Sequence, residues 1–272
     1  MTGHEGPDPR FPYLLEHDRF QFPDPETAVQ GIVASGGNLS PGMLLSAYEQ
    51  GLFPWYNPGE PVLWHSPDPR FVLFPQKLHI SSSMAKVFRR GIFELRFDTA
   101  FSRVIENCAA VHRPRQHGTW INTDVIAAYT ELYQLGYAHC AESYFEGELA
   151  GGCYGILLGQ MFFGESMFAR YSNASKAAFI GLAEQLFDAG ITLIDCQVPT
   201  VHLASLGAEE IPRRRFLKLL NKALLNGLSP KIDFSKINTN CVRAGGKKDN
   251  AEYGQEIGIP CNEKLPSAQY KK

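Results

Sequence analysis

Two apolar, strand-like segments of this chain each carry an acidic side chain that such a run seldom tolerates. Residues 164–168 read Gly-Glu-Ser-Met-Phe, and about thirty residues later residues 194–197 read Ile-Asp-Cys-Gln. A buried carboxylate costs free energy unless it is paired or hydrogen-bonded. Because about one helix's length of chain separates the segments, we expect neighbouring strands whose acidic side chains, Glu165 and Asp195, meet in a cleft. Such a cleft suits proton transfer or the binding of a cation.

The pattern around these two segments predicts the fold class. Residues 173–189 have the features of a helix, and the largely apolar run 191–195 suits a buried, parallel strand. Three successive strand candidates precede the helix: 138–145, 149–157 and 160–168. Short Gly-containing turns join them, which is typical of an antiparallel meander. The sequence therefore predicts an α+β fold with a mixed, mostly antiparallel sheet that has one parallel pairing in its middle.

The chain changes character twice along its length. Residues 1–75 are dense in Pro, Gly and aromatic residues around one short helix at 40–49, which indicates a small N-terminal α/β domain. Residues 76–230 alternate strands and helices, and we expect a second, larger domain there. Residues 231–272 are polar and without periodicity, so we expect a poorly ordered tail.

Composition narrows the class of protein. The chain has 272 residues, a formal net charge of -2 and 44% hydrophobic residues, enough for a sizeable core. No apolar run is long enough for a membrane span and the N-terminus lacks a signal pattern, so we expect an intracellular protein without a membrane partner. The near-zero charge argues against strong nonspecific nucleic-acid binding but permits a local basic patch.

Six cysteines are scattered without a Cys-x-x-Cys pair. We therefore expect neither a disulfide framework nor a zinc site. Cys140, Cys153 and Cys196 lie in apolar strand candidates and are interpreted as small buried side chains. None of the eight histidines has a partner at metal or triad spacing, and we interpret them as structural or surface residues.

The order of elements matches that of an acyltransferase of the GNAT type, in which two strands splay apart around the acyl donor. Users of acetyl-CoA carry a Gly-rich loop whose backbone N–H groups bind the pyrophosphate. The equivalent stretch here, 169–176, has no glycine, which favours another donor. An acyl-CoA-dependent N-acyltransferase stays open as the alternative. A nonenzymatic RNA-binding module is a third hypothesis. The acidic pair argues against it, because two carboxylates would repel phosphates.

Several short motifs stand in a fixed order between about residue 11 and residue 225. They are FPWY at 53–56, WHSPDPR at 64–70, HIS at 79–81, GTWI at 118–121, GGCYG at 151–155, GESMF at 164–168, NASK at 173–176, DCQ at 195–197 and SLGA at 205–208. Each motif is weak alone, but the set resembles the leucyl/phenylalanyl-tRNA–protein transferases. The tail after about residue 230 shows no such resemblance.

The resemblance implies an aminoacyltransferase that needs no metal or other cofactor. Enzymes of this family move Leu or Phe, and Met less well, from aminoacyl-tRNA to the α-amine of a protein that starts with Arg or Lys. The product then enters the bacterial N-end rule pathway of protein degradation. The family also implies a small N-terminal domain beside a GNAT-like catalytic domain, here at 76–230. We expect a cytoplasmic monomer.

Three polar residues are the candidate catalytic group. Asp195 and Gln197 lie two apart on one strand and should share a face. The family places a polar relay there, so Gln197 would orient the attacking amine. Asp195 would polarise Gln197 or hold the cationic N-terminal residue of the acceptor. Glu165 fits the same anchoring role, and the sequence leaves open which of the three acts on the proton.

Two further sets of residues complete the expected site. An apolar pocket for the Leu or Phe side chain is predicted from Trp55, Trp120, Phe162 and Phe168, with Cys153 and Tyr154 nearby. Trp55 could instead stack on the terminal adenine, and Ser175 is expected to face the 3′ nucleotide. Contacts to tRNA phosphates, which would carry affinity rather than sequence information, are predicted for Arg70, Lys86, Arg89, Arg90, Arg113 and Arg115. Another basic cluster, 213–215 with Lys218 and Lys222, is interpreted as a solvated helix end.

Overall fold

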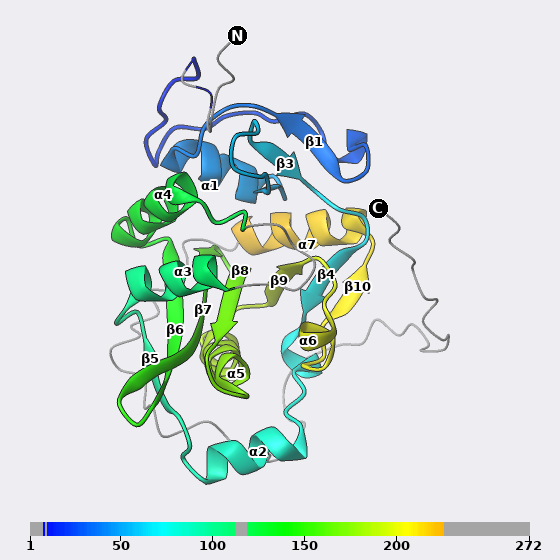
Figure 1. Ribbon diagram of the computed structural model, residues 1–272. Coiled ribbons are helices and arrows are strands. Elements are labelled where there is room, and N and C mark those ends of the chain that lie inside the picture. Colours follow the sequence, from blue (N-terminus) through cyan, green and yellow to red (C-terminus); the bar gives the residue numbers. More distant parts are fainter. Residues whose placement is uncertain (1–7, 9, 112–118, 226–272) are drawn as a thin grey trace.

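A large mixed sheet with helices on both faces, and a smaller sheet above it, make up the molecule in this computed structural model (Figure 1). The structure describes residues 8, 10–111 and 119–225. The predicted tail at 231–272 lies outside these residues. The predicted mixture of helices with a mostly antiparallel sheet is confirmed.

The large sheet has seven strands in the order β10-β4-β9-β8-β7-β6-β5. The strands are β4 (Arg70–Leu73), β5 (Glu94–Phe97), β6 (Ala138–Phe145), β7 (Glu148–Leu158), β8 (Met161–Ala169), β9 (Leu193–Gln197) and β10 (Glu209–Ile211). Only the pair β8 and β9 is parallel. The expected meander and the expected parallel pairing are thus both present.

The connection between β8 and β9 is the helix α5 (Ala174–Asp188). A parallel pair requires a crossover of this kind. Gly190 ends the crossover helix with a φ of 93°, in the left-handed region that glycine adopts freely. This crossover places β9 beside β8, so the two acidic segments of the sequence lie on adjacent strands.

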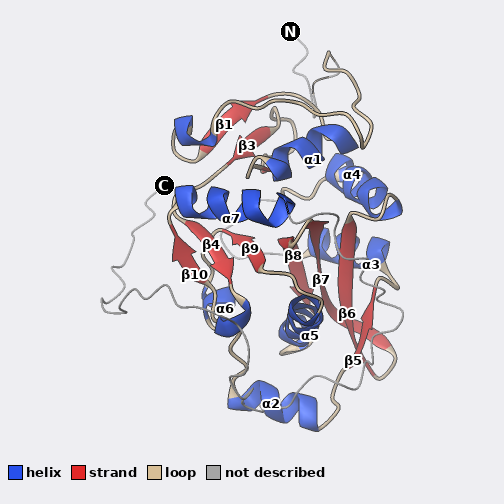
Figure 2. Ribbon diagram, turned by 180° about the vertical axis from the view of Figure 1, so that it is seen from behind, coloured by secondary structure: helices blue, strands red, loops and turns tan. Residues whose placement is uncertain are grey.

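Helices cover both faces of the large sheet (Figures 1 and 2). On one face, α3 (Phe101–Ala110), α4 (Thr123–Gln134) and α7 (Arg213–Leu225) share a hydrophobic core with α1 (Pro41–Glu49). On the other face, α5 packs over a second core together with α2 (Ser82–Arg89). The short helix α6 (Val201–Ala204) follows β9. The helix α2 was not predicted, because its eight residues are short for a periodicity argument.

The N-terminal part forms a three-stranded antiparallel sheet in the order β1-β3-β2 beside α1. Its strands are β1 (Ile32–Ser35), β2 (Phe53–Pro54) and β3 (Leu63–His65), and short 3-10 helices lie at Pro25–Thr27 and Pro75–Lys77. Strand β4 falls within the predicted domain 1–75 but pairs with β9 in the large sheet. The boundaries at 75 and 230 stay predictions.

The cysteines of the described strands are buried, as predicted from their apolar surroundings. Cys140, Cys153 and Cys196 are all free thiols with little exposed surface. Within residues 8, 10–111 and 119–225, no group of three or more His, Cys, Asp or Glu side chains is arranged to hold a metal ion. No helix of the same residues combines the length and apolarity that a membrane span requires.

Candidate active site

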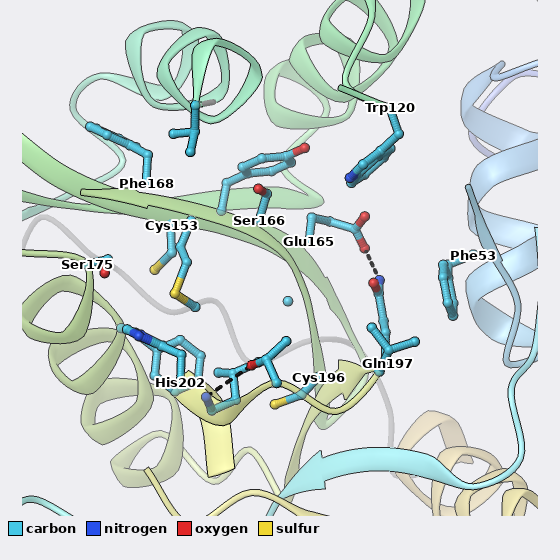
Figure 3. A pocket seen from close by; sticks show the side chains of 18 of the residues that line it. Phe53, Trp120, Cys153, Glu165, Ser166, Phe168, Ser175, Cys196, Gln197 and His202 are labelled. Carbon is cyan, nitrogen blue, oxygen red and sulfur yellow. Dashed lines mark hydrogen bonds between the residues drawn. The ribbon is translucent and has the colours of Figure 1, made fainter. Parts of the chain in front are cut away.

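A cavity of about 560 Å³ opens where β8 and β9 part (Figure 3). Their pairing ends at Phe163 and Asp195. Beyond that point β9 continues beside β4, where Gln197 pairs with Phe71, while β8 continues beside β7. The divergence leaves a gap in the sheet, and side chains from β2, β7, β8, β9, α5 and α6 line it.

An irregularity of β8 directs Glu165 into this gap. Tyr154 of β7 pairs with Ser166 and the next residue, Gly155, pairs with Gly164, so Glu165 is the extra residue of a β-bulge. Bulges re-aim side chains near active sites. A Cβ at Gly155 would lie 2.1 Å from the carbonyl oxygen of Phe163, so only glycine allows this close approach. Gly155, the last glycine of the GGCYG motif, therefore helps to shape the site.

The Glu165 carboxylate accepts three hydrogen bonds. Tyr48 of α1 donates to Oε1 over 2.8 Å, and Tyr129 of α4 donates to Oε2 over 3.1 Å. The two tyrosine hydroxyls also lie within hydrogen-bond distance of each other. Because each has a single proton, this contact is a hydrogen bond only when one hydroxyl donates to the other instead of to Glu165. Gln197 of β9 donates from Nε2 to Oε1 over 2.8 Å, which Figure 3 shows as a dashed line. The carboxylate therefore joins α1, α4 and β9 at one wall of the cavity.

Burial changes the acidity of this cluster. Burial, with a smaller contribution from the Asp195 charge, raises the pKa of Glu165 to about 7, although its three hydrogen bonds oppose the rise. Burial and the neighbouring Glu165 charge raise the pKa of Tyr48 and of Tyr129 well above 10. The tyrosines thus stay protonated donors at neutral pH, whereas Glu165 changes its charge near neutrality.

Gln197 is held at both its backbone and its side chain. Its backbone has a φ of 63°, which is uncommon for a residue other than glycine, and its N–H donates to Oδ1 of Asp195 over 2.9 Å. Because the Nε2 group donates to Glu165, the amide orientation is fixed. The carbonyl oxygen Oε1 of Gln197 accepts no hydrogen bond from any residue in the described ranges. It is the acceptor that this wall offers to a ligand.

Asp195 is not part of the cavity wall. Its carboxylate makes a bidentate pair with Arg70, from Nε over 2.9 Å and from Nη2 over 2.6 Å, and both side chains are 0% exposed. The guanidinium also lies 4.8 Å from the ring centroid of Phe53 and 4.4 Å from that of Phe216. Asp195 reaches the cavity only through the backbone N–H of Gln197.

This pair corrects two expectations. Arg70 was expected to contact tRNA phosphates. Its guanidinium has no exposed surface and is already paired with the Asp195 carboxylate, so a phosphate cannot reach it. Asp195 was expected to hold the acceptor's cationic residue or to polarise Gln197. Its cationic partner is instead Arg70 of the same chain, whereas a contact with Gln197 is present as the hydrogen bond from the Gln197 backbone N–H.

The predicted pocket residues all line the cavity. Trp120, Cys153, Phe162 and Ser175 are buried, whereas Trp55 is 39% exposed. Figure 3 shows Trp120 on the side of Glu165, and Cys153 on the side of Ser175. Their roles in binding stay predictions.

Three residues of the site were missed by sequence reasoning. Tyr48 and Tyr129 lie at apolar positions of their helices, and the only signal was that a buried tyrosine hydroxyl needs a partner. His202 lines the cavity and has a buried Nε2 atom without a hydrogen-bond partner among the described residues. Burial, together with the nearby Lys176, lowers the pKa of His202. It is thus a cavity residue rather than the surface or structural histidine expected.

Three other basic residues predicted to contact phosphates lie away from the cavity. Lys86, Arg89 and Arg90 are exposed on α2 and at its C-terminal cap, and no ion pair holds any of them to another described residue. In both Figure 1 and Figure 2, α2 lies at the end of the molecule opposite to α1. Arg113 and Arg115 lie outside the described residues.

Comparisons with known proteins cover the same part of the chain. A family model described as leucyl/phenylalanyl-tRNA protein transferase matches residues 72–221, and the model of that family's N-terminal domain matches residues 37–68. The leucyl/phenylalanyl-tRNA–protein transferase of Myxococcus xanthus (strain DK1622) is 56% identical over 215 residues, covering 78% of this chain and 92% of the relative. The enzyme of the same name from Nitrosomonas europaea is 54% identical over 210 residues, covering 76% and 88%.

Proposed function

Because this chain belongs to the leucyl/phenylalanyl-tRNA protein transferase family and is thereby an aminoacyltransferase, we propose that its acceptors are proteins that begin with Arg or Lys. It transfers Leu or Phe, and Met less well, from tRNA to the N-terminal α-amine. The transfer takes place in the cytoplasm, where the enzyme acts as a monomer, and it directs the acceptor into N-end rule degradation. The observation that carries the proposal is the Gln197–Glu165 hydrogen bond at the wall of an apolar cavity.

The apolar part of the cavity receives the Leu or Phe side chain. Cys153, Phe162 and Met167 line it, and its volume of about 560 Å³ accommodates side chains of either shape. An apolar pocket discriminates by only about 1–3 kcal/mol per methylene, which suits an enzyme that accepts several side chains. Trp120 adds a wall on the side of Glu165. Trp55 is 39% exposed at the cavity and offers a ring face on which an unpaired adenine can stack.

The reaction is the aminolysis of an ester that is already activated. The amine nitrogen forms a bond to the carbonyl carbon, the bond from that carbon to the ribose oxygen breaks, the amine gives up a proton and the ribose oxygen takes one. The free Oε1 of Gln197 accepts a hydrogen bond from the amine and so directs its lone pair at the ester. Holding two reactants in this geometry supplies much of the rate enhancement.

Glu165 works through Gln197 in this proposal. Its carboxylate is occupied by Tyr48, Tyr129 and Gln197, so it does not serve as the anchor for the acceptor's guanidinium or ammonium. By accepting from Nε2, the ionised carboxylate fixes the amide and increases the negative charge on its oxygen. Asp195 adds a second constraint on the same residue through its backbone.

The wider arrangement is proposed to be GNAT-like. Strands β8 and β9 part around the cavity, and the segment that leads into α5 contains no glycine. The donor in the gap is then an aminoacyl ester rather than a pyrophosphate-bearing thioester. Lys86, Arg89 and Arg90 are proposed to contact phosphates of the bound tRNA.

The test is a transfer assay with radiolabelled Leu-tRNA and three peptides that differ only in their first residue: Arg, Lys or Ala. We expect label on the Arg and Lys peptides alone, and none from labelled acetyl-CoA. Gln197→Ala should lower the rate at least a hundredfold while leaving the affinity for uncharged tRNA unchanged. Label on the Ala peptide, or transfer from acetyl-CoA, would contradict the proposed specificity.

A further inference from the structure

Helix α7 presents a basic surface that the proposed chemistry does not use. Phe216, Leu220 and Ala223 are buried against the body of the protein. The opposite side carries exposed basic residues, which we call the α7 basic face: Arg214, Arg215, Lys218 and Lys222. Their spacing puts Arg214, Lys218 and Lys222 one turn apart along a single stripe, with Arg215 beside it.

No acidic residue offsets this charge within the helix. The sequence of α7 contains no Asp or Glu, and no residue of the α7 basic face pairs with a carboxylate of the described chain. Arg213 is different, because it is buried and donates from Nη1 to the carbonyl oxygen of Ser66 over 2.7 Å. Since the whole chain has a formal net charge of -2, the cluster does not follow from a generally basic composition.

Two cations lie at the unfavourable end of the helix. Arg214 and Arg215 are in the first turn of α7, whose own sequence has no acidic residue, and the helix macrodipole is positive at this end. The Asp68 carboxylate accepts a hydrogen bond from the Arg213 backbone N–H over 3.0 Å at the same end, so it offsets part of the dipole. Among the described residues, no carboxylate forms an ion pair with Arg214 or Arg215, and both side chains are therefore available to a polyanion.

We propose that the α7 basic face binds backbone phosphates in the body of the tRNA, an inference that rests on the proposed function. The acceptor protein is a poor occupant because its Arg or Lys terminus is cationic. Residues 226–272 carry eight Lys or Arg against five Asp or Glu, so this segment has no acidic excess with which to cover the face. A nucleic-acid backbone supplies the matching charge at regular intervals.

The position of α7 indicates an extended ligand. In both Figure 1 and Figure 2, α7 lies beneath α1 in the upper half of the molecule, whereas α2 lies at the lower end. The buried face of α7 places the ring of Phe216 against Arg70, the partner of Asp195. An aminoacylated adenosine is too small to contact both basic helices and the cavity, but a whole tRNA is large enough.

The test uses a triple variant, Arg214→Gln/Lys218→Gln/Lys222→Gln, and a control that removes three positive charges elsewhere, Arg10→Gln/Arg96→Gln/Arg103→Gln, of which Arg10 and Arg96 are paired with Asp8 and Glu94. Affinity for uncharged tRNA is measured at 50 and 200 mM salt. We expect the triple variant to lose affinity at least tenfold at the lower salt concentration. The slope of log K against log salt should fall by about two to three, the number of phosphate contacts removed. The control should retain both the affinity and the slope of the unmodified chain.

A short donor, the leucyl ester of adenosine, separates this inference from the proposed function. Transfer from the short donor to an Arg peptide should be unchanged in the triple variant, while kcat/KM with Leu-tRNA falls. The inference is overturned if the triple variant binds tRNA like the control, or if binding to phosphatidylglycerol vesicles is lost while tRNA affinity is kept. If the unmodified chain transfers from neither donor, the proposed function fails, and the binding measurement still decides the role of α7.

Discussion

Gln197 donates a hydrogen bond from Nε2 to Oε1 of Glu165 over 2.8 Å, across the gap between β9 and β8. The bond determines which end of the amide faces the cavity. It also makes the orientation of Gln197 depend on the charge of Glu165, because an ionised carboxylate can only accept whereas a protonated one can also donate. The pKa of about 7 for Glu165 places this dependence near neutral pH.

The first prediction concerns the pH dependence of transfer. As the pH rises through about 7, Glu165 ionises and the amide becomes fixed in the productive orientation. We expect kcat/KM with Leu-tRNA to rise through that pH. Glu165→Gln should abolish this inflection and leave only that of the acceptor amine, at about pH 8. The measurement is a pH–rate profile of each variant under single-turnover conditions.

The tyrosines provide the control for this assignment. Hydrogen bonds from Tyr48 and Tyr129 lower the pKa of Glu165 from what burial alone would impose. Tyr48→Phe or Tyr129→Phe should therefore move the inflection to higher pH without removing it. An inflection that stays in place in both tyrosine variants would mean that another group titrates.

The free energy of unfolding should also depend on the ionisation of Glu165, and it should fall as the pH rises. The pKa of Glu165 is raised from 4.5 in a free carboxyl to about 7 in the folded protein, so between these values the folded state keeps a proton that the unfolded state has lost. Stability contributed in this way is fully present below about pH 4.5 and is lost as the pH rises through 7. We expect the free energy of unfolding in urea to fall more between pH 5 and pH 8 for the unmodified chain than for Glu165→Gln. Equal slopes would contradict the raised pKa.

Much of the fold was predictable from local patterns, because residues 138–197 form a meander, a crossover helix and a parallel strand that are consecutive in sequence. The partners of the two carboxylates were not. Arg70 lies 125 residues before Asp195, on a strand too short to show a pattern, and Tyr48 lies 117 residues before Glu165. Which buried carboxylate finds a cation and which finds hydroxyls depends on tertiary packing. The sequence indicated that Glu165 and Asp195 need partners, but it did not indicate which residues these are.

The backbone of Gln197 yields a comparison of two substitutions. Both Gln197→Gly and Gln197→Ala remove the amide, so we expect both to lose transfer activity equally. The two variants differ in the conformational cost of the φ of 63° at this position, because glycine adopts this angle without the steric clash of a Cβ. Gln197→Gly should therefore be the more stable of the two by about 1 kcal/mol. Urea unfolding measures the difference, and a more stable alanine variant would show that the left-handed conformation is not retained in solution.

The buried pair of Arg70 and Asp195 should dominate the stability of this region. Arg70→Met leaves an unpaired buried carboxylate, and we expect a loss of about 3–5 kcal/mol. Adding Asp195→Asn removes that charge while keeping an oxygen that can accept from the Gln197 N–H. The double variant should thus be more stable than Arg70→Met alone and should regain part of its activity. Additive losses in urea unfolding would argue against a coupled pair.

The last prediction separates the amino acid from the tRNA. Trp120 is 8% exposed and lines the cavity on the side of Glu165, so Trp120→Ala removes a wall that the esterified Phe side chain contacts. We expect KM for Phe-tRNA to rise at least tenfold, while the affinity for uncharged tRNA changes less than twofold, because the phosphate contacts lie elsewhere. Trp55→Ala is the matched comparison, since Trp55 is 39% exposed and a partner for adenine should weaken charged and uncharged tRNA alike. Equal effects of Trp120→Ala on both forms of tRNA would place Trp120 against the nucleotide and leave the amino-acid pocket to Cys153 and Phe162.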